Sequence, residues 1–293
     1  MANDEISNRK SQISNPGSLI LPHHILQFSK RTLVMGVLNV TPDSFSDGGL
    51  YHEKDKAIER GMEMEEEGAD LLDIGGESTR PGSDPVPVKE ELHRVLPVIE
   101  GLRDRVKIPL SIDTYKSEVA KESLKAGAEI VNDISGLRFD EKMAETVASF
   151  GAGLVICHIQ GTPKEMQVNP HYDNLLGEIR ESLREGIEKG VDHGVHEIMI
   201  DPGIGFGKKV EDNLVILHRL MELQSLERPI LVGPSRKSFI GKILDLPVEE
   251  RLEGTAAAVA IAVMNGASMV RVHDVKEIVR VVRIVDAIKN SKE

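Results

Sequence analysis

From residue 32 onward, short apolar runs alternate along the chain with longer amphipathic stretches rich in Glu and Lys. A short apolar run bounded by Gly and polar residues is typical of a buried strand, whereas a long amphipathic stretch is typical of a surface helix. Regular alternation of the two predicts β/α units and a parallel sheet. The eight apolar runs are residues 33–38, 71–74, 110–112, 130–131, 154–156, 198–200, 230–232 and 269–272.

Helix candidates fill the intervals between these runs. They are residues 54–67, 89–102, 117–126, 173–189, 213–223, 256–264 and 275–289. Eight such units within about 260 residues fit a closed (β/α)₈ barrel better than an open doubly wound sheet. We therefore expect an α/β protein with the TIM-barrel fold, in which residues 29–293 form one barrel domain.

Residues 1–28 contain Ser, Asn, Pro and Gly with little periodicity, so we expect a polar, partly ordered extension before the barrel. The pair His23 and His24 lies in this segment. Nothing nearby in the sequence completes a metal site around them, since such a site needs three or four ligands.

Composition narrows the function classes. The chain has 36 Lys and Arg against 48 Asp and Glu, a formal net charge of −12, and only 3% aromatic residues without Trp. Binding to nucleic acid or to anionic membranes needs basic surface and aromatic platforms, so neither partner is expected. Cys157, the one cysteine, excludes an intrachain disulfide framework and favours a reducing compartment. The sequence shows no secretory signal and no apolar run near the ~20 residues of a membrane helix, so we expect a cytoplasmic protein.

Polar residues follow directly after the apolar runs, where a β/α barrel carries its active site. Each has an ordinary explanation alone: Asp113 and Asp133 could cap helices, residues 203–207 could be a turn, and His158 could be a core histidine. Their convergence at one end of one barrel favours function. The segments are 39–49, 75–82, Asp113, Asn132 and Asp133, His158, 201–208, 233–238, and Arg271 with His273 and Asp274.

Sorting these groups by charge indicates two halves of a ligand. Asp113, Asn132 and Asp201 offer acceptors and an amide, and Lys237 adds a donor, which suits a flat heterocycle with amino and lactam N–H groups. The cationic donors Arg80, Arg236, Arg271 and His273 indicate an anionic group, and phosphate is a frequent ligand of this fold. The strand ends lack the set of histidines that would hold a hydrolytic zinc, whereas a diphosphate usually brings Mg²⁺.

With these residues in place, the chain resembles the dihydropteroate synthases of folate biosynthesis. The resemblance runs from about residue 32 to the C-terminus, in blocks 39–49, 73–82, 111–114, 131–134, 158–163, 201–208, 235–238 and 271–275. It implies a (β/α)₈ barrel that is usually a homodimer. It also implies an enzyme that joins 6-hydroxymethyl-7,8-dihydropterin diphosphate to 4-aminobenzoate and releases diphosphate.

The resemblance implies a role for each matching residue. Pterin binding falls to Asp113, Asn132, Asp201 and Lys237, diphosphate binding to Thr79, Arg271 and His273, and Mg²⁺ binding to Asn39. Phe45, Arg80 and Ser238 are implied near 4-aminobenzoate, under loops that close from the first two strands. The implied reaction is a dissociative substitution at the pterin methylene, so no obligatory base or nucleophile is expected.

Three alternatives stay open. A pterin-dependent methyltransferase shares the pterin-holding Asp and Asn residues, but it has no use for a diphosphate site. A Schiff-base aldolase would use Lys237 as nucleophile, although here this lysine opens a helix after Arg236. A non-catalytic paralogue would bind a pterin without turnover. One departure from the family pattern, Pro234 before Ser235, touches none of the proposed ligands.

Overall fold

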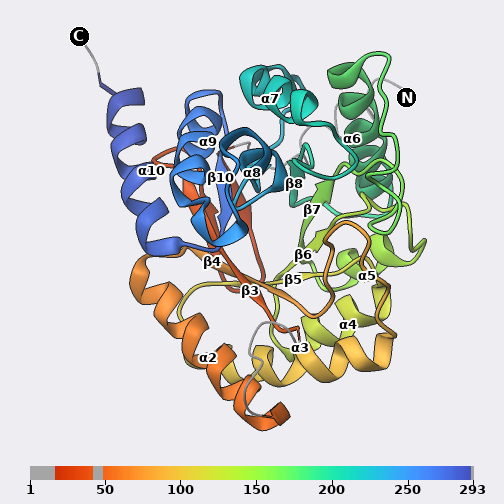
Figure 1. Cartoon of the computed structure of the whole chain (residues 1–293). Coiled ribbons are helices and arrows are strands. Elements are labelled where there is room, and N and C mark those ends of the chain that lie inside the picture. The colour runs from red at the N-terminus through yellow and green to blue at the C-terminus, as the bar shows by residue number, and fades with distance from the viewer. Residues whose placement is uncertain (1–16, 42–48, 292–293) are drawn as a thin grey trace.

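The computed structural model describes the backbone of residues 17–41 and 49–291, and the side chains of those residues except 49–53 (Figure 1). Eight parallel strands form its central sheet, in the order β8-β7-β6-β5-β4-β3-β10-β9. A parallel bridge between Ile200 and Ile230 joins the two ends of that order, β8 and β9. The strands are β3 (Leu33–Asn39), β4 (Leu71–Gly75), β5 (Leu110–Asp113), β6 (Ile130–Asp133), β7 (Gly153–Cys157), β8 (Ile198–Asp201), β9 (Leu231–Val232) and β10 (Met269–Val272).

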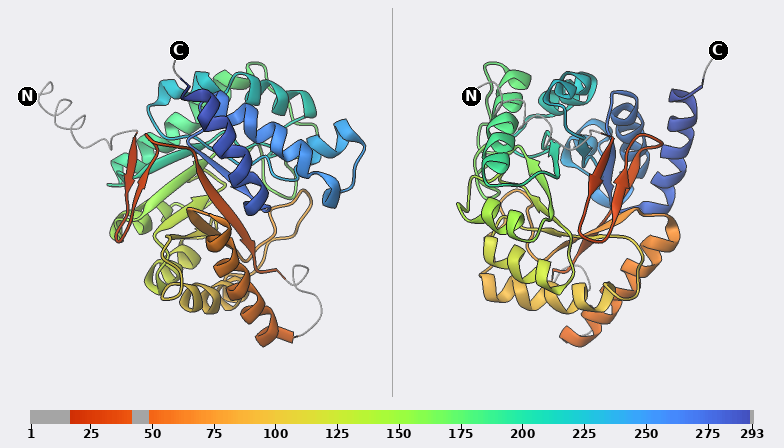
Figure 2. Two further views of the ribbon diagram at one scale, coloured as in Figure 1. Left: turned by 90° about the vertical axis from the view of Figure 1, so that its left-hand side faces the viewer. Right: turned by 180° about the vertical axis from the view of Figure 1, so that it is seen from behind.

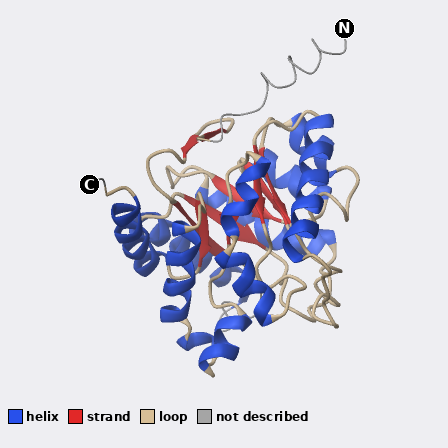
Figure 3. Ribbon diagram, turned by 90° about the horizontal axis from the view of Figure 1, so that it is seen from above, coloured by secondary structure: helices blue, strands red, loops and turns tan. Residues whose placement is uncertain are grey.

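Helices surround the strands on the outside, as Figure 3 shows from above. They are α2 (Gly49–Glu67), α3 (Val88–Leu102), α4 (Ser117–Ala126), α5 (Met143–Ser149), α6 (Leu175–Asp192), α7 (Val210–His218), α8 (Ser238–Leu244), α9 (Leu252–Met264) and α10 (Val275–Lys289), with 3₁₀ turns η2 (Leu220–Leu226) and η3 (Val248–Glu250). The predicted (β/α)₈ barrel is confirmed. None of the helices in the described ranges is long and apolar enough to cross a membrane.

Two details differ from the predicted elements. The single helix expected over residues 213–223 is instead α7 followed by η2, because the backbone leaves helical geometry at Arg219. Helix α5, of seven residues, was not predicted, and α8, also of seven residues, was anticipated only as a helix that opens at Lys237, without its extent. Two turns are too short for a 3.6-residue period to be recognised in the sequence.

Residues 17–28 were expected within the extension, and here the structure corrects the sequence analysis. β1 (Ser18–Ile20) and β2 (Ile25–Gln27) pair as an antiparallel hairpin, which lies across one end of the barrel in Figure 2. Leu19 and Leu26 are 0% and 5% exposed. They pack on the first inward-facing side chains of the strands, which include Leu33, Leu71, Ile130, Val155, Met199, Leu231 and Met269. The hairpin therefore closes the amino-terminal end of the barrel, which we call its floor.

Acidic side chains fasten the hairpin to this end. The Glu129 carboxylate accepts from the His23 backbone N–H at 2.7 Å and lies 2.5 Å from His24 Nδ1, while Glu197 Oε2 accepts from the Ile20 N–H at 2.8 Å. His24 thus pairs with a carboxylate of the barrel. Leu19, Leu21 and Leu26 are too few and too closely spaced to show a period among polar neighbours, which explains why the hairpin was not recognised in the sequence.

Replacing Leu26 by Ala tests the hairpin as part of the core. We expect Leu26→Ala to lower the free energy of unfolding by about 2–4 kcal/mol, because it leaves a cavity over the barrel floor. Its neighbour Ile25 is 58% exposed, so Ile25→Ala should cost under about 1 kcal/mol. Urea unfolding of both variants measures the difference, and equal losses would show that the hairpin is not part of the core.

Candidate functional site

The period of two along each strand divides the barrel interior into two layers. Strand residues whose side chains point inward alternate with residues that point to the helices. At the floor the inward positions are apolar, as described above. One step further along the strands they become polar or glycine: Asn39, Asp73 and Gly75, Ser111 and Asp113, Asn132, Asp201, Arg271 and His273. The chain therefore places its polar layer at the carboxyl ends of the strands.

A buried ion pair stands at the centre of this layer. Arg271 Nε lies 2.6 Å from Asp73 Oδ2, and Arg271 Nη2 lies 2.7 Å from Asp113 Oδ2. Asn132 Nδ2 donates to the same Asp73 oxygen at 2.9 Å. The structure thus brings together three predicted site residues, Arg271, Asp113 and Asn132, and adds Asp73 as their common partner.

Asp73 was not singled out in the sequence, although a signal was present. It is a fully buried carboxylate within an apolar strand run, at the inward position two residues before Gly75. A charged residue at such a position needs a buried partner, because an isolated ion in the interior is very costly. A basic residue at an inward position of another strand, such as Arg271, is the partner that this reasoning finds.

Two carboxylates share one guanidinium here, and this imbalance of charge affects the pKa of Asp113. Burial raises the pKa of Asp113 to about 7; the Arg271 charge opposes this rise and the Asp73 charge adds to it. The same two carboxylates raise the pKa of Arg271 against the effect of burial. Within the described part of the chain, Asp113 Oδ1 and Asp73 Oδ1 have no hydrogen-bond partner. Asp113 thus keeps an acceptor for a donor from outside the protein.

Asp201 and Lys237 form the next part of the polar layer. Asp201 is buried, and its Oδ1 accepts from the Gly203 N–H at 2.7 Å. Lys237 precedes α8, and its Nζ lies 4.0 Å from the centre of the Phe206 ring, a cation–π contact. Burial lowers the pKa of Lys237 to about 8, helped by Arg271 and opposed by Asp201. Asp201 and Lys237 therefore lie close enough in the polar layer for the charge of each to shift the pKa of the other.

The basic residues near β10 do not form the free cationic cluster that the charge sorting indicated. Arg236 pairs with Asp274 through Nε at 3.0 Å and Nη2 at 2.5 Å, and Arg271 is engaged as described above. His273 Nδ1 lies 3.0 Å from Ser235 Oγ, and burial, reinforced by Arg271 and Arg236, lowers the pKa of His273 to about 3. His273 is therefore a neutral imidazole in this structure.

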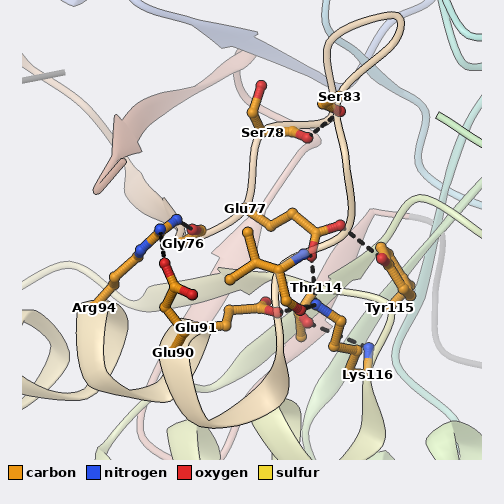
Figure 4. A network of polar contacts seen from close by, with 11 residues as sticks. Gly76, Glu77, Ser78, Ser83, Glu90, Glu91, Arg94, Thr114, Tyr115 and Lys116 are labelled. Carbon is orange, nitrogen blue, oxygen red and sulfur yellow. Dashed lines mark hydrogen bonds and ion pairs between the residues drawn. The ribbon is translucent and has the colours of Figure 1, made fainter. Parts of the chain in front are cut away.

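The loop after β4 carries Thr79, which is half-buried, and Arg80, which is exposed. Figure 4 shows the polar network at its base. Glu77 accepts from the Tyr115 hydroxyl at 2.6 Å and from the Val86 N–H at 2.8 Å, and it pairs with Lys116. Lys116 Nζ also donates to the Val86 carbonyl at 2.6 Å, so both ends of the loop are tied to one ion pair.

Two further contacts complete that base. The second carboxylate on Lys116 is the buried Glu91, whose Oε2 lies 2.5 Å from Nζ. Arg94 Nη1 donates to the Gly76 carbonyl at 2.7 Å. Sequence reasoning missed this network, because Glu91 read as an ordinary residue of a helix and Lys116 as the residue that precedes one. The network holds the base of the loop, so that Thr79 and Arg80 project from a fixed frame.

The remaining predicted site residues lie around the same end of the barrel, its mouth, where the strands end. Asn39 ends β3, and a Cβ added at Gly75 would lie 3.6 Å from both Asn39 Oδ1 and Asp113 Cβ, so the Asn39 and Asp113 side chains flank Gly75 from the two neighbouring strands. Ser238 is exposed at the first position of α8. Phe45 lies outside the described residues. No group of three or more His, Cys, Asp or Glu side chains within the described ranges could hold a metal ion.

Comparisons with known proteins agree with this geometry. The family model for pterin binding enzymes matches residues 35–273. The dihydropteroate synthase of Synechocystis is 46% identical over 93% of this chain and 96% of its own, and that of Bacillus subtilis is 47% identical over 90% and 91%.

Solved structures resemble the whole barrel. Yersinia pestis dihydropteroate synthase with a sulfonamide drug complex has a TM-score of 0.89 and 44% identity over 94% of this chain and all of its own. Xanthomonas albilineans dihydropteroate synthase with 4-aminobenzoic acid has a TM-score of 0.89 and 41% identity over 95% of this chain and all of its own. By its sequence, its fold and the polar layer at the mouth of its barrel, this chain belongs to the pterin binding enzymes and, among them, to the dihydropteroate synthase family.

Proposed function

We propose that this chain joins 6-hydroxymethyl-7,8-dihydropterin diphosphate to 4-aminobenzoate, giving 7,8-dihydropteroate and diphosphate for folate biosynthesis. One observation carries the proposal: Asp113, Asn132, Asp201 and Lys237, from four different strands or their loops, meet at the mouth of a barrel whose relatives are dihydropteroate synthases. Among those relatives, the enzyme of Clostridium difficile was crystallised in the presence of pteroic acid.

The pterin ring fits the polar layer by its hydrogen-bonding pattern. A pterin presents an amino group and a lactam N–H on one edge, and both are donors. Asp113 keeps a buried oxygen without a partner, and Asp201 places a second carboxylate across the mouth. Lys237 offers a donor to a ring nitrogen or carbonyl. A site that hydrogen-bonds its ligand through buried groups discriminates strongly between ligands, because an analogue without the matching donors leaves those groups unpaired.

The reaction we propose is a dissociative substitution. The bond between the pterin methylene carbon and the diphosphate oxygen breaks, and its electron pair leaves with diphosphate. The amine of 4-aminobenzoate then forms the new C–N bond and loses a proton to water. Thr79, Arg271 and His273 hold the departing diphosphate, and Asp113 and Asp201 stabilise the cationic pterin. Phe45, Arg80 and Ser238 surround 4-aminobenzoate.

Mg²⁺ is the metal that we propose for the diphosphate. Mg²⁺ usually keeps several waters and takes one or two protein oxygens besides phosphate. Asn39 fits this pattern, since it offers a single amide oxygen at the mouth beside Gly75, without a closed cage of acidic ligands among the described residues. When bound, the ion would neutralise part of the charge on the departing diphosphate.

We also propose a homodimer. Neighbouring helices α7, α8 and α9, seen together in Figure 1, expose large apolar side chains. With η2 they present Leu214, Met221, Ile243, Leu244, Ile261 and Met264. Several exposed apolar side chains on neighbouring helices are typical of an interface, and a second copy of the chain is the partner we propose for them.

The cytoplasm is the compartment in which we propose that the protein works. Its one cysteine, Cys157, is buried as a free thiol within the barrel. A reducing compartment suits a chain that places no reliance on disulfides.

The proposed reaction is tested directly with the purified protein, both substrates and Mg²⁺. We expect dihydropteroate by mass and diphosphate in equal amounts, and we expect Asp201→Ala to lower kcat/KM by about 100-fold, because it removes a buried acceptor for the pterin. Asp104→Ala, an exposed carboxylate, is the control and should leave the rate unchanged. Pterin binding without product would instead favour the non-catalytic paralogue or the methyltransferase.

The metal proposal predicts that EDTA abolishes product formation and that added Mg²⁺ restores it. Asn39→Ala should raise the Mg²⁺ concentration for half-maximal rate by about tenfold, since it removes one of few protein ligands. Asn290→Ala, at an exposed position after α10, should not change it. An EDTA-resistant rate, or an unchanged Mg²⁺ requirement in Asn39→Ala, would contradict the assignment.

The dimer proposal predicts that Ile261→Asp shifts the sedimenting species from dimer to monomer, because it places a charge in a buried apolar contact. Ile284 is also exposed but lies on α10, so Ile284→Asp serves as the control. Analytical ultracentrifugation of the two variants decides the question. A wild-type monomer, or a dimer that survives Ile261→Asp, would refute this surface.

A further inference from the structure

The loop after β8, residues 203–207, lies between the end of β7 and Lys237. Gly203 has a φ of +71°, and a Cβ built there would stand 1.8 Å from the His158 carbonyl oxygen. Gly205 has a φ of +82°, and its Cβ would stand 3.0 Å from Lys237 Cδ. Only glycine permits both the left-handed conformation and this closeness. The loop is therefore in direct contact with both neighbours.

Side chains hold this loop at several points. Asn213 Oδ1 accepts from the Gly205 N–H at 2.7 Å, and Gln167 Nε2 donates to the Gly205 carbonyl at 2.8 Å. The Tyr172 hydroxyl donates to the Gly207 carbonyl at 2.7 Å. These contacts come from two segments, the loop between β7 and α6 and the helix α7, so the loop is a fixed platform within the mouth.

Lys208 ends the platform as a buried cation that the proposed reaction does not use. It is 3% exposed, and its Nζ lies 2.9 Å from His158 Nδ1 and 3.0 Å from the Phe206 carbonyl oxygen. These partners are neutral, and no carboxylate in the described ranges forms an ion pair with Lys208. Burial accordingly lowers its pKa to about 7. A buried ammonium with neutral acceptors alone is costly, which indicates that its position matters.

His158 accepts this ammonium in a defined state. Its pKa is lowered to about 2 by burial, with the charges of Lys208 and Arg138 adding to the effect. The imidazole is therefore neutral, and Nδ1 can accept from Lys208 only when the proton is on Nε2. Lys208 thereby joins the end of β7 to the backbone of Phe206.

Phe206 carries this connection to the mouth. Its carbonyl receives Lys208, and its ring lies 4.0 Å from Lys237 Nζ. We propose that Lys208 is a positioning residue of the pterin subsite, whose ammonium fixes Phe206 against the end of β7 and, through the Phe206 ring, fixes the Lys237 ammonium. This inference rests on the proposed function, in which Lys237 binds the pterin.

Lys208→Met tests the inference, because it keeps the length of the side chain and removes its donors. We expect both the Kd for dihydropterin diphosphate, measured by calorimetry, and the KM for this substrate to rise about tenfold, since a misplaced ligand loses most of its interaction with the substrate. The KM for the second substrate, 4-aminobenzoate, should stay within about twofold. Lys242→Met removes the same charge from an exposed position of α8 and should change neither constant.

A double-mutant cycle separates positioning from a loss of stability. If Lys208 acts through the Phe206 ring, Phe206→Leu weakens pterin binding, and adding Lys208→Met to it weakens binding little further. Nitrogen-15 NMR supplies a second readout, because His158 should lose its single tautomer in Lys208→Met. Independent, additive effects, or a tenfold rise in KM for both substrates, would overturn the inference.

Two outcomes distinguish a failure of this inference from a failure of the proposed function on which it rests. Normal pterin binding by Lys208→Met, together with weak binding by Asp201→Ala, would refute the role of Lys208 and leave the proposed site intact. Normal binding by both variants would refute the pterin site itself. If Lys208→Met does not fold, Phe206→Leu decides. Loss of a ring that positions Lys237 must weaken pterin binding even though Lys208 is present.

Discussion

The rest of the mouth depends on one interaction, the ion pair of the Arg271 guanidinium with the buried carboxylates of Asp73 and Asp113. These residues come from strands far apart in the sequence, so the contact forms only once β10, the last strand, has paired with β3 beside β4 and β5. The carboxylates outnumber the cation, and for that reason one of them keeps capacity for a ligand. Removing Arg271 would leave two uncompensated charges in the interior, which is far more costly than losing one surface ion pair.

The same alternation of side chains builds both the stability and the site of this barrel. One inward layer is apolar and packs against the hairpin, and the next inward layer is charged and faces the mouth. The strands need only one sequence period to specify both layers. The apolar layer holds the strands in register, and this register sets Asp113 beside Gly75 and Asn132.

Much of this arrangement could be predicted from the sequence, because period and position carry it. Eight apolar runs predicted the barrel, and reading the residue after each run found Asp113, Asn132 and Asp201. What the sequence analysis missed was the pairing of charges, although the charge of Asp73 within an apolar strand run gave a signal for it. Asp73 and Lys208 are hidden in segments that read as strand and turn. Their partners are distant in the sequence: Arg271 lies on β10, and His158 follows the end of β7. Arg236 read as a ligand for an anion, yet it pairs with Asp274. Such pairings depend on side-chain direction across the closed barrel.

The hairpin of β1 and β2 has a consequence for how this protein is made. It is synthesised before any strand of the barrel, but the surface that covers Leu19 and Leu26 includes Met269 of the last strand. The cover over its leucines therefore stays incomplete until translation has nearly ended. A ribosome that stops early releases a chain with an open barrel floor and exposed leucines, the kind of surface by which chaperones recognise incomplete proteins. The hairpin, made before the barrel strands, thus reports whether the last strand is present.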